Sequence, residues 1–427
     1  MKKGLYYLLL VICMMGMFCG CKKEDEPLKV YAVRSEAVYT TAIDAYMKEH
    51  SEENIQVTSF DSYEDMETQL KTELMSGAGP DVLLFNSFYN SEDMYKLCTG
   101  NSLLALDEQV RSLTRDEYFE EILDAGVMNG HQYFVPLSWN VLQVYSSEKA
   151  IDGKEYDEPY TAIVEEAAAL AAEDNYGLSS LQIGRADVVQ LFVEASGELL
   201  VDPKTGELIV EKEKLQRTAE YVKVFYDNMD KMRSITTKYR NDFAGAVSHL
   251  TFLIEDYPFM SNFRFYETLY PQYVSSDMQV MFYEQYEGGM TAQIIQYGAV
   301  NANTKCADKA WDFLRCLLDD ASVEMNFSKY DEQTIYYAPV NKKVYEECVK
   351  QLETEMGPGP NRKVGPLSEE SGEMLLNLPS QITLGVIPNA ALGTLVQECL
   401  APYLSGTDSF DHCYDELLQQ LKLYLNE

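Results

Sequence analysis

Apolar and polar positions in the first quarter of the chain alternate between short strand-like runs and longer helix-like stripes. The predicted order is strand, helix, strand, helix, strand, over residues 29–33, 37–49, 55–59, 63–75 and 81–85. Gly77, Gly79 and Pro80 end the second helix, because glycine and proline break a helical pattern. The last run, DVLLF, is continuously apolar, which is typical of a strand buried in a parallel sheet. This alternation predicts the start of a doubly wound α/β fold.

The rest of the chain keeps both strand and helix patterns. Residues 131–145 form a long β-rich run that Pro136 interrupts, and a sheet tolerates proline at an edge or a crossing point. We therefore expect the chain to cross there into a second lobe and to return through a strand over residues 292–301. Helical patterns occupy residues 159–173, 215–229, 304–318 and 410–425, the last with apolar residues spaced by three and four.

Two lysines and a short apolar run open the chain. Lys2 and Lys3 precede residues 5–18, a run too short for a bilayer span of about 20 residues, so it predicts a secretory signal peptide. The Gly20–Cys21 pair resembles the end of a bacterial lipoprotein signal. That resemblance implies removal of residues 1–20, acylation of Cys21 with chains such as palmitate, and a tether over residues 21–28. An ordinary secretory signal with a coincidental cysteine is the alternative.

The charge balance excludes some classes of partner. The chain has 34 Lys and Arg against 69 Asp and Glu, a net charge of −35. Nucleic-acid phosphates and anionic lipid surfaces need clustered basic residues, so we expect neither nucleic-acid binding nor electrostatic attachment to a membrane. The apolar share of 46% is that of a folded globular protein rather than a disordered one.

Motifs for catalysis, cofactors and metals are missing from the sequence. None of the G-x-S-x-G, H-E-x-x-H and G-x-x-x-x-G-K-[ST] patterns occurs, and the chain has only four histidines. Its cysteines form no C-x-x-C pair and no Cys/His group with zinc spacing. We therefore predict no enzyme activity, no cofactor and no metal. Cys399 with Cys413 is the first disulfide to test, and buried free thiols fit equally well.

Five segments in order resemble the family 1 extracellular solute-binding proteins, the receptors of ABC importers. They are residues 74–85 (LMSGAGPDVLLF), 129–147 (NGHQYFVPLSWNVLQVYSS), 195–210 (ASGELLVDPKTGELIV), 300–320 (VNANTKCADKAWDFLRCLLDD) and 405–425 (SGTDSFDHCYDELLQQLKLYL). The resemblance implies a two-lobed periplasmic-binding-protein-like α/β fold with crossing hinge strands. The expected lobes are residues 29–136 with 292–340, and residues 137–291 with 341–427.

The same resemblance implies the function. We expect a monomeric lipoprotein, anchored by lipid to the outer side of the cell membrane, that binds a small solute in the cleft between its lobes. The family's usual ligands make a sugar or oligosaccharide the expected solute, and ABC permease subunits the expected partners. Three alternatives stay open: a peptide or cationic solute, a secreted carboxylate-dependent glycosidase, and a structural or adhesive surface lipoprotein.

Candidate solute-binding residues lie where strands end, because open α/β sheets bind ligands at the carboxyl ends of their strands. Aromatic faces and uncharged or acidic hydrogen-bonding groups are the side chains that hold sugars. The set comprises Glu36, Tyr39, Asn86, Trp139, Asn140, Asp256, Tyr257 and Tyr337. Each has a rival interpretation, which is packing in the core for the aromatic residues and a solvated loop for the polar ones.

Overall fold

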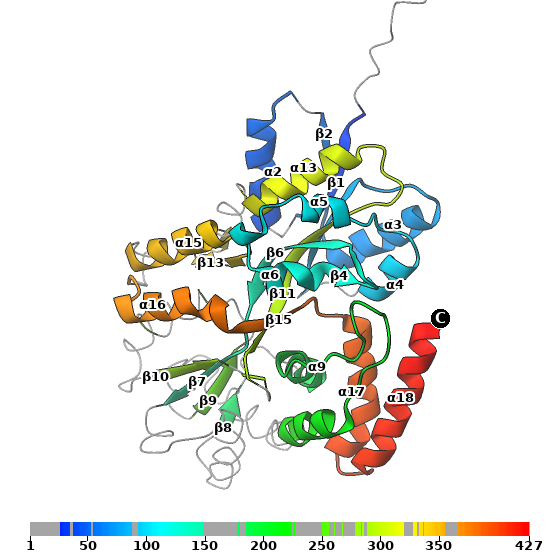
Figure 1. Ribbon diagram of the computed structural model, residues 1–427, viewed down its shortest axis with the longest axis vertical. Coiled ribbons are helices and arrows are strands. Elements are labelled where there is room, and N and C mark those ends of the chain that lie inside the picture. The colour runs from blue at the N-terminus through cyan, green and yellow to red at the C-terminus, as the bar shows by residue number, and fades with distance from the viewer. Residues whose placement is uncertain are drawn as a thin grey trace, which may run out of the picture.

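Two β-sheets, with strands that run from one into the other, organise the computed structural model (Figure 1). The structure describes residues 26–34, 37–52, 54–87, 93–147, 177–179, 185–223, 226, 250–255, 260, 267, 278–282, 284–285, 288–319, 328–330, 333–335, 337–354 and 365–426. Among these residues, no helix is both long enough and apolar enough to cross a membrane.

The larger sheet has the strand order β14-β6-β11-β3-β1-β2, with β15 paired to β11. Its strands are β1 (Leu28–Val33), β2 (Ile55–Phe60), β3 (Val82–Asn86), β6 (Phe134–Asn140), β11 (Met290–Val300), β14 (Ala338–Pro339) and β15 (Ile382–Val386). β1 is parallel to β2 and β3, whereas β11 is antiparallel to β3 and β6. Every residue of β3 is buried, so the continuous apolar run at residues 81–85 correctly predicts an interior strand.

Helices and short elements cover the larger sheet. They are α2 (Ala37–Glu49), α3 (Tyr63–Met75), α4 (Met94–Thr99), α5 (Asp107–Arg111), η1 (Arg115–Glu117), α6 (Glu120–Leu123), η2 (Asp124–Gly126), β4 (Val127–Met128), β5 (His131–Gln132), α13 (Ala307–Asp319), α15 (Lys342–Thr354), α16 (Glu369–Asn377) and η5 (Leu378–Gln381). α13 buries Ala310, Trp311, Phe313, Leu314 and Leu317. Their spacing of three and four residues explains why this helix packs on the sheet.

The smaller sheet has the order β10-β7-β9-β8. Its strands are β7 (Gln143–Ser147), β8 (Gly177–Ser179), β9 (Leu250–Glu255) and β10 (Met278–Phe282), and a separate hairpin joins β12 (Ser328–Tyr330) to β13 (Gln333–Ile335). Beside the smaller sheet lie α9 (Arg185–Ala195), a helix over residues 212–223, α17 (Ala390–Leu404) and α18 (Phe410–Asn426) (Figure 1). These helices share a second hydrophobic core that includes Phe192, Val222, Leu400 and Leu417.

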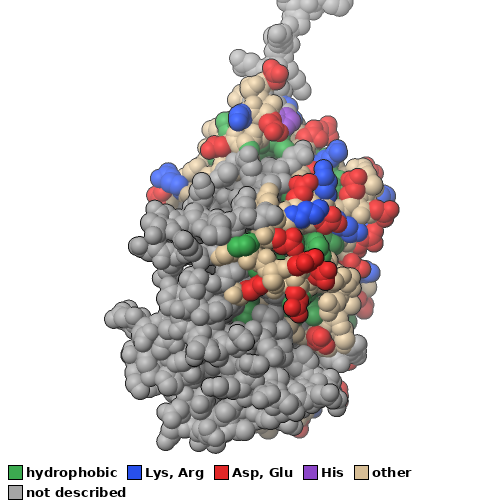
Figure 2. Space-filling model, turned by 90° about the vertical axis from the view of Figure 1, so that its left-hand side faces the viewer, with side chains coloured by type: hydrophobic (Ala, Val, Ile, Leu, Met, Phe, Trp, Pro, Cys, Tyr) green, Lys and Arg blue, Asp and Glu red, His purple; other side chains and the backbone are tan. Residues whose placement is uncertain are grey.

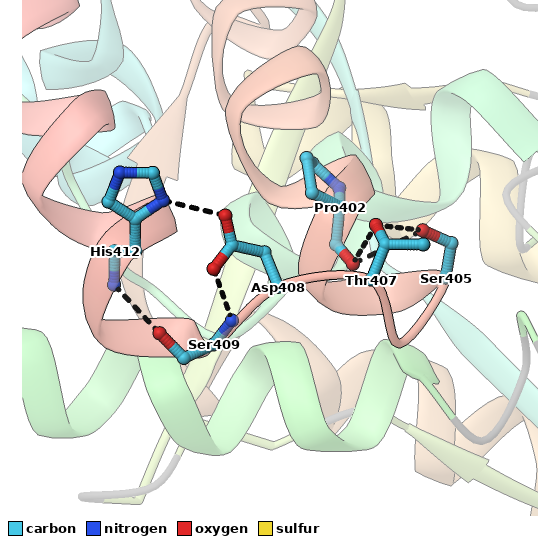
Figure 3. A network of polar contacts seen from close by, with 6 residues as sticks. All are labelled: Pro402, Ser405, Thr407, Asp408, Ser409 and His412. Atoms are coloured by element: carbon cyan, nitrogen blue, oxygen red, sulfur yellow. Dashed lines mark hydrogen bonds and ion pairs between the residues drawn. The ribbon is translucent and has the colours of Figure 1, made fainter.

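A network of polar contacts joins α17 to α18 (Figure 3). The Ser405 and Thr407 hydroxyls each donate to the Pro402 carbonyl, and the Ser409 hydroxyl accepts from the backbone N–H of His412 at 3.3 Å. The Asp408 carboxylate accepts from the Ser409 N–H at 2.7 Å and contacts His412 Nδ1 at 2.6 Å. These bonds satisfy backbone groups where α17 ends and α18 begins, so they fix the angle between the two helices.

The chain crosses from the larger sheet to the smaller one at Val141 and Leu142, between β6 and β7. This crossing lies inside the run of residues 131–145 where the sequence predicts it, but after the expected lobe boundary at Pro136, which lies inside β6 opposite Tyr297 of β11. β14 pairs only with Ser138 and Trp139 of β6, so among the described strands Pro136 has an open edge on that side. The proline therefore marks an edge position, and the β11 register shifts beside it.

The division of the C-terminal third differs from the expected one. Residues 341–427 were assigned to the second lobe, yet α15 and α16 pack into the larger core through Val344, Leu352 and Leu375. β15 also pairs with β11 of the larger sheet. Only α17 and α18 pack into the core of the smaller sheet. The reason is that β15 buries Ile382 in the larger core before the chain reaches α17.

Many charged side chains lie at the surface of the protein, whereas Cys399 and Cys413 are buried. Figure 2 shows Asp and Glu side chains spread over the described part of one face, with Lys and Arg between them. The charged side chains on this face therefore lie at the surface, as expected for ionised groups. Cys399 and Cys413 are both buried free thiols, so the disulfide suggested between them is not formed.

Candidate functional site

Polar side chains gather where the chain passes between the sheets. Asn86 at the end of β3, Gln296 of β11 and Ser138 of β6 lie in register across three neighbouring strands. Asn140 ends β6 and Gln143 begins β7. All five side chains are fully buried, and none carries a charge. We call these five residues the amide cluster.

Hydrogen bonds connect the side chains of the amide cluster, and one buried N–H donor of the cluster has no acceptor among the described residues. The Ser138 hydroxyl donates to Gln296 Oε1 at 2.9 Å. Gln143 Nε2 donates to the Val141 carbonyl at 2.6 Å and to Asn140 Oδ1 at 3.3 Å, and the Tyr145 hydroxyl donates to Gln143 Oε1 at 3.2 Å. Gln296 Nε2 has no hydrogen-bond partner in the described part of the chain. A buried donor without an acceptor costs about 1–3 kcal/mol, so this amide is suited to a bound acceptor.

Two aromatic residues chosen from the sequence belong to the core. Tyr39 is fully buried, and its hydroxyl donates to the carbonyl of Phe85. Trp139 is also fully buried, and its Nε1 donates to the Pro339 carbonyl at 3.0 Å. The Trp139 ring stacks on Tyr345 with 5.7 Å between the ring centroids. Packing in the sheet's core takes up both rings in this structure, and a contact of Trp139 or Tyr39 with a solute stays a prediction.

The other residues chosen from the sequence fall into two groups. Asn86, Asn140 and Tyr337 are described and buried, and the first two belong to the amide cluster. Glu36, Asp256, Tyr257 and the predicted acylation site Cys21 lie outside the described residues. Three members of the amide cluster were not chosen from the sequence: Gln296, Ser138 and Gln143. Only the pairing of the strands shows that they belong to it. The sequence did contain a signal for Gln296, because a polar amide stands out within the largely apolar run of residues 292–301.

A pocket of about 390 Å³ lies between the two hydrophobic cores. α6, η2, β4 and β15 form one wall, and α9, α17 and residues 198–204 form the other. A glycine in each wall lets the elements of that wall pack closely: a Cβ at Gly385 would lie 2.5 Å from the Glu121 carbonyl oxygen, and one at Gly393 would lie 2.0 Å from Gln190 Oε1. Apolar lining comes from Val127, Met128, Val193, Leu200, Leu384 and Val396.

Two carboxyl groups give this pocket its chemical character. Burial raises the pKa of Glu194 to about 7 and that of Glu198 to about 7. The Glu194 carboxyl accepts from Gln190 Nε2 at 2.8 Å and from Gln293 Nε2 at 3.2 Å, and Glu198 accepts from the Thr218 hydroxyl at 2.6 Å. Within the described chain, neither carboxylate forms an ion pair. We call this space the acidic pocket.

The amide cluster and the acidic pocket are separate places. They share no residue, and the pocket lining contains none of the residues that the sequence analysis chose. The cluster lies where strands end and cross, so a rule about strand ends could find part of it. The pocket is lined mainly by helices and a loop, together with β4 and β15, and the rule about strand ends selected none of its lining residues.

Comparisons with known proteins identify relatives of this architecture. A family model described as bacterial extracellular solute-binding protein matches residues 41–356. No curated protein sequence matches the chain significantly.

Solved structures match over almost the whole chain. A sugar transporter of Rhizobium etli in an open conformation is 17% identical with a TM-score of 0.62, covering 93% of this chain and 99% of its own. The GacH receptor of Streptomyces glaucescens, solved unliganded and with acarbose, is 16% identical with a TM-score of 0.60 and covers 94% and 98%. Maltose-bound MalE3 of T. maritima is 13% identical with a TM-score of 0.59 and covers 93% and 99%. These similarities confirm the predicted α/β fold class.

Proposed function

Because this chain belongs to the bacterial extracellular solute-binding proteins, we propose that it captures an uncharged solute, a sugar or oligosaccharide, and delivers it to an ABC-type permease. The family places the protein on the outer side of the membrane. The similar solved structures support a sugar, since they include a sugar transporter, a receptor in complex with acarbose and a protein with maltose bound. The solute would contact both lobes only in a closed arrangement, which is why binding would favour closure.

The observation that carries this proposal is the unpaired buried donor of Gln296. A sugar hydroxyl accepts and donates hydrogen bonds, so it can satisfy Gln296 Nε2 without bringing a charge into the junction. Asn86 and Asn140 supply further uncharged groups beside it. We propose these three residues as solute contacts, together with Glu36, Asp256 and Tyr257 as earlier predictions outside the described chain.

The proposed lobes follow the two hydrophobic cores rather than the division expected from sequence. The first would combine residues 26–140 with 290–387, and the second residues 141–289 with 390–426, because most of the described buried residues of each set share one core. Val141, Met260 and Phe282 are exceptions, since they fall in the second set by position but pack in the first core. Val141 and Leu142 on one crossing, and the start of β11 on the other, would then act as the hinge.

The deciding experiment measures sugar affinity by calorimetry on the protein and on Gln296→Met, which keeps the length of the side chain but removes its donor. A panel of neutral mono- and oligosaccharides identifies the ligand first. We expect Gln296→Met to weaken its binding by about 10- to 100-fold, the equivalent of about 1–3 kcal/mol for a buried donor.

Gln293→Met is the matched control, because Gln293 lies on the same strand but donates to Glu194 instead. It should keep the affinity of the protein. Equal losses in both variants, or none in Gln296→Met, would contradict the proposed site.

The anchor and the fate of the solute are further parts of the proposal. We infer removal of residues 1–20, acylation of Cys21, and a monomer tethered through residues 21–28. Cys21→Ala should then move the protein from the membrane fraction to the soluble fraction of lysed cells. We also infer that the solute is released unchanged, so chromatography after long incubation should recover intact sugar, whereas cleavage products would support a glycosidase.

A cationic solute is the second candidate function, and the acidic pocket is the observation that favours it. Glu194 and Glu198 could each accept from an ammonium group whose apolar body contacts Val193 and Leu384. A thermal-shift screen separates the two functions. Stabilisation by a polyamine or basic peptide, and by no sugar, would replace the first candidate with this one.

A further inference from the structure

Three metal-ligating side chains that are far apart in the sequence meet on the larger lobe. Glu49 is the last residue of α2, His50 follows it, and Cys316 lies on α13. One ligand atom from each residue, a carboxylate oxygen, an imidazole nitrogen and the thiol sulfur, lies within 4.8 Å of the other two. Cys316 and His50 are half-buried and Glu49 is exposed, so an ion from solvent can reach them.

Helix packing holds the three residues in place. The rings of Tyr46 on α2 and Phe313 on α13 meet edge to face, with 4.9 Å between their centroids. Glu49 and His50 follow Tyr46 by three and four residues, and Cys316 follows Phe313 by three, so each lies on the same helix face as its aromatic anchor. The contact between the two rings therefore sets the spacing of the ligands.

Two local features favour a cation at this position. The His50 ring stacks on Tyr46 at 4.1 Å between centroids with an interplanar angle of 12°, which restricts its orientation. The backbone N–H of His50 donates to the Tyr46 carbonyl at 2.8 Å, so the site lies at the C-terminal end of α2. The helix dipole places partial negative charge at that end.

We propose that Glu49, His50 and Cys316 bind a divalent transition-metal ion, with Zn²⁺ as the best match. Thiolate, imidazole and carboxylate are the ligands of protein zinc sites, and three of them leave the fourth tetrahedral position to water. Bond lengths of about 2.0–2.3 Å put neighbouring ligand atoms about 3.5 Å apart. The three ligand atoms now lie within 4.8 Å of one another, so small rotations of the side chains bring them to that geometry. Binding displaces the thiol proton of Cys316 into solvent, so affinity rises with pH.

This site is separate from the proposed solute site. α2 has 13 residues and therefore spans about 20 Å. Its first residue follows the carboxyl end of β1, the edge that Asn86 of the parallel strand β3 also reaches. Glu49 and His50 lie at its other end. A bound ion would thus join α2 to α13 without touching the amide cluster.

The test uses the purified protein without a histidine tag and titrates it with ZnCl₂ alone by calorimetry, with MgCl₂ as the comparison. We expect one Zn²⁺ per chain, no Mg²⁺ binding, and a melting temperature raised by about 5 °C at a hundredfold excess over Kd. Co²⁺ in place of Zn²⁺ should give the thiolate charge-transfer absorption that only a cysteine-ligated ion shows.

Variants decide whether these residues hold the ion. Cys316→Ser and His50→Asn should each weaken Zn²⁺ binding by more than about tenfold, and Cys316→Ser should abolish the charge-transfer band. Cys306→Ser and His412→Asn are matched controls, a half-buried thiol just before the same helix and an exposed histidine. Both should bind as the unaltered protein does.

Melting curves without metal show whether each variant is folded. Glu49→Gln changes the exposed member of the three proposed ligands. No Zn²⁺ binding, or binding that survives both Cys316→Ser and His50→Asn in folded protein, would overturn the proposal. Sugar affinity should be the same with and without Zn²⁺, so failure here leaves the solute site untouched.

Discussion

The amide cluster and the acidic pocket are two separate interior places that hold different kinds of polar group. The cluster consists of neutral amides and a hydroxyl on strands. Two carboxyls of the pocket, Glu194 on α9 and Glu198 beside it, have raised pKa values. Its lining also includes Glu121, Asp124 and Asp202. Burial acts differently on the two: it leaves a neutral donor of Gln296 unsatisfied and raises the pKa of Glu194 to about 7. The two places therefore differ in the charge that they can offer to a ligand.

Both places also depend on how rigidly their walls are held. The strands around the amide cluster are fixed by a continuous ladder and by stacked aromatic rings, including Trp139 on Tyr345. The walls of the pocket come from two cores that are joined by packing and by a few hydrogen bonds, such as the one from Gln293 Nε2 to Glu194. Substitutions near the cluster should therefore cost stability, whereas substitutions in the pocket should change its response to pH.

Trp139→Ala should give the largest effect. Removing a fully buried indole creates a cavity and should lower the free energy of unfolding by about 3–5 kcal/mol. Urea denaturation of the protein without solute measures this loss. Trp139→Phe keeps a ring against Tyr345 and should lose much less. An unchanged stability together with lost sugar affinity would return Trp139 to the solute site.

Glu194→Gln should remove the part of the pH dependence of stability that comes from the protonation of Glu194. In the folded protein Glu194 keeps its proton up to a pKa of about 7, whereas in the unfolded chain it releases the proton near its ordinary pKa of 4.5. The folded state therefore binds more protons in this range, and stability falls as pH rises through it. At pH about 8 the variant should be more stable by about 2 kcal/mol, and at pH about 4 the two should be alike.

Glu220→Gln is the matched control for that substitution. Gln216 donates to Glu220 at 2.9 Å, as Gln190 donates to Glu194 at 2.8 Å, four residues apart in both cases. Glu220 is exposed, so its replacement should leave the pH dependence of urea denaturation unchanged. A similar response from both variants would mean that general surface charge, and not the pocket, governs stability.

The sequence predicted the fold best where one element follows another along the chain. The runs at residues 29–33 and 81–85 became β1 and β3 because continuous apolar strands have no alternative to burial. Pro136 misled the prediction of the lobe boundary, since a proline at an edge and one at a crossing have the same sequence signal. The membership of α15, α16 and β15 depends on contacts with β11 and β14, which no local pattern reveals.

The candidate site was predictable only in part for the same reason. Asn86 and Asn140 end strands and so could be chosen from the sequence, whereas Gln296 and Ser138 join them only through register across the sheet. Trp139 could belong to the core or to a cleft on sequence alone. Its burial and its hydrogen bond to Pro339 place the ring in the core of this structure. His50 and Cys316 have no zinc spacing in the sequence because two separate helices bring them together.

Ser138→Ala should have a smaller effect than the two substitutions above. It removes the donor to Gln296 Oε1 and leaves that buried acceptor without its partner. We expect about 1 kcal/mol less stability and several-fold weaker sugar binding, because Gln296 loses the contact that orients it. Ser112→Ala, whose hydroxyl bonds the Gln109 carbonyl on the surface, should change neither quantity. Equal sugar affinity in both variants would show that Ser138 does not position Gln296.

The smallest effect is expected at Asp408, a carboxyl that contrasts with Glu194. Hydrogen bonds from His412 and from the Ser409 N–H lower the pKa of Asp408, and Asp408 raises the pKa of His412 (Figure 3). Both groups lie in solvent, so Asp408→Asn should hardly change stability. In NMR titrations the pKa of His412 should fall in this variant, while the carboxyl of Glu194 still titrates near pH 7. Partners lower a carboxyl pKa at the surface and burial raises it in the pocket, so a Glu194 that titrated like Asp408 would show that the pocket is open to water and that its charge cannot select a ligand.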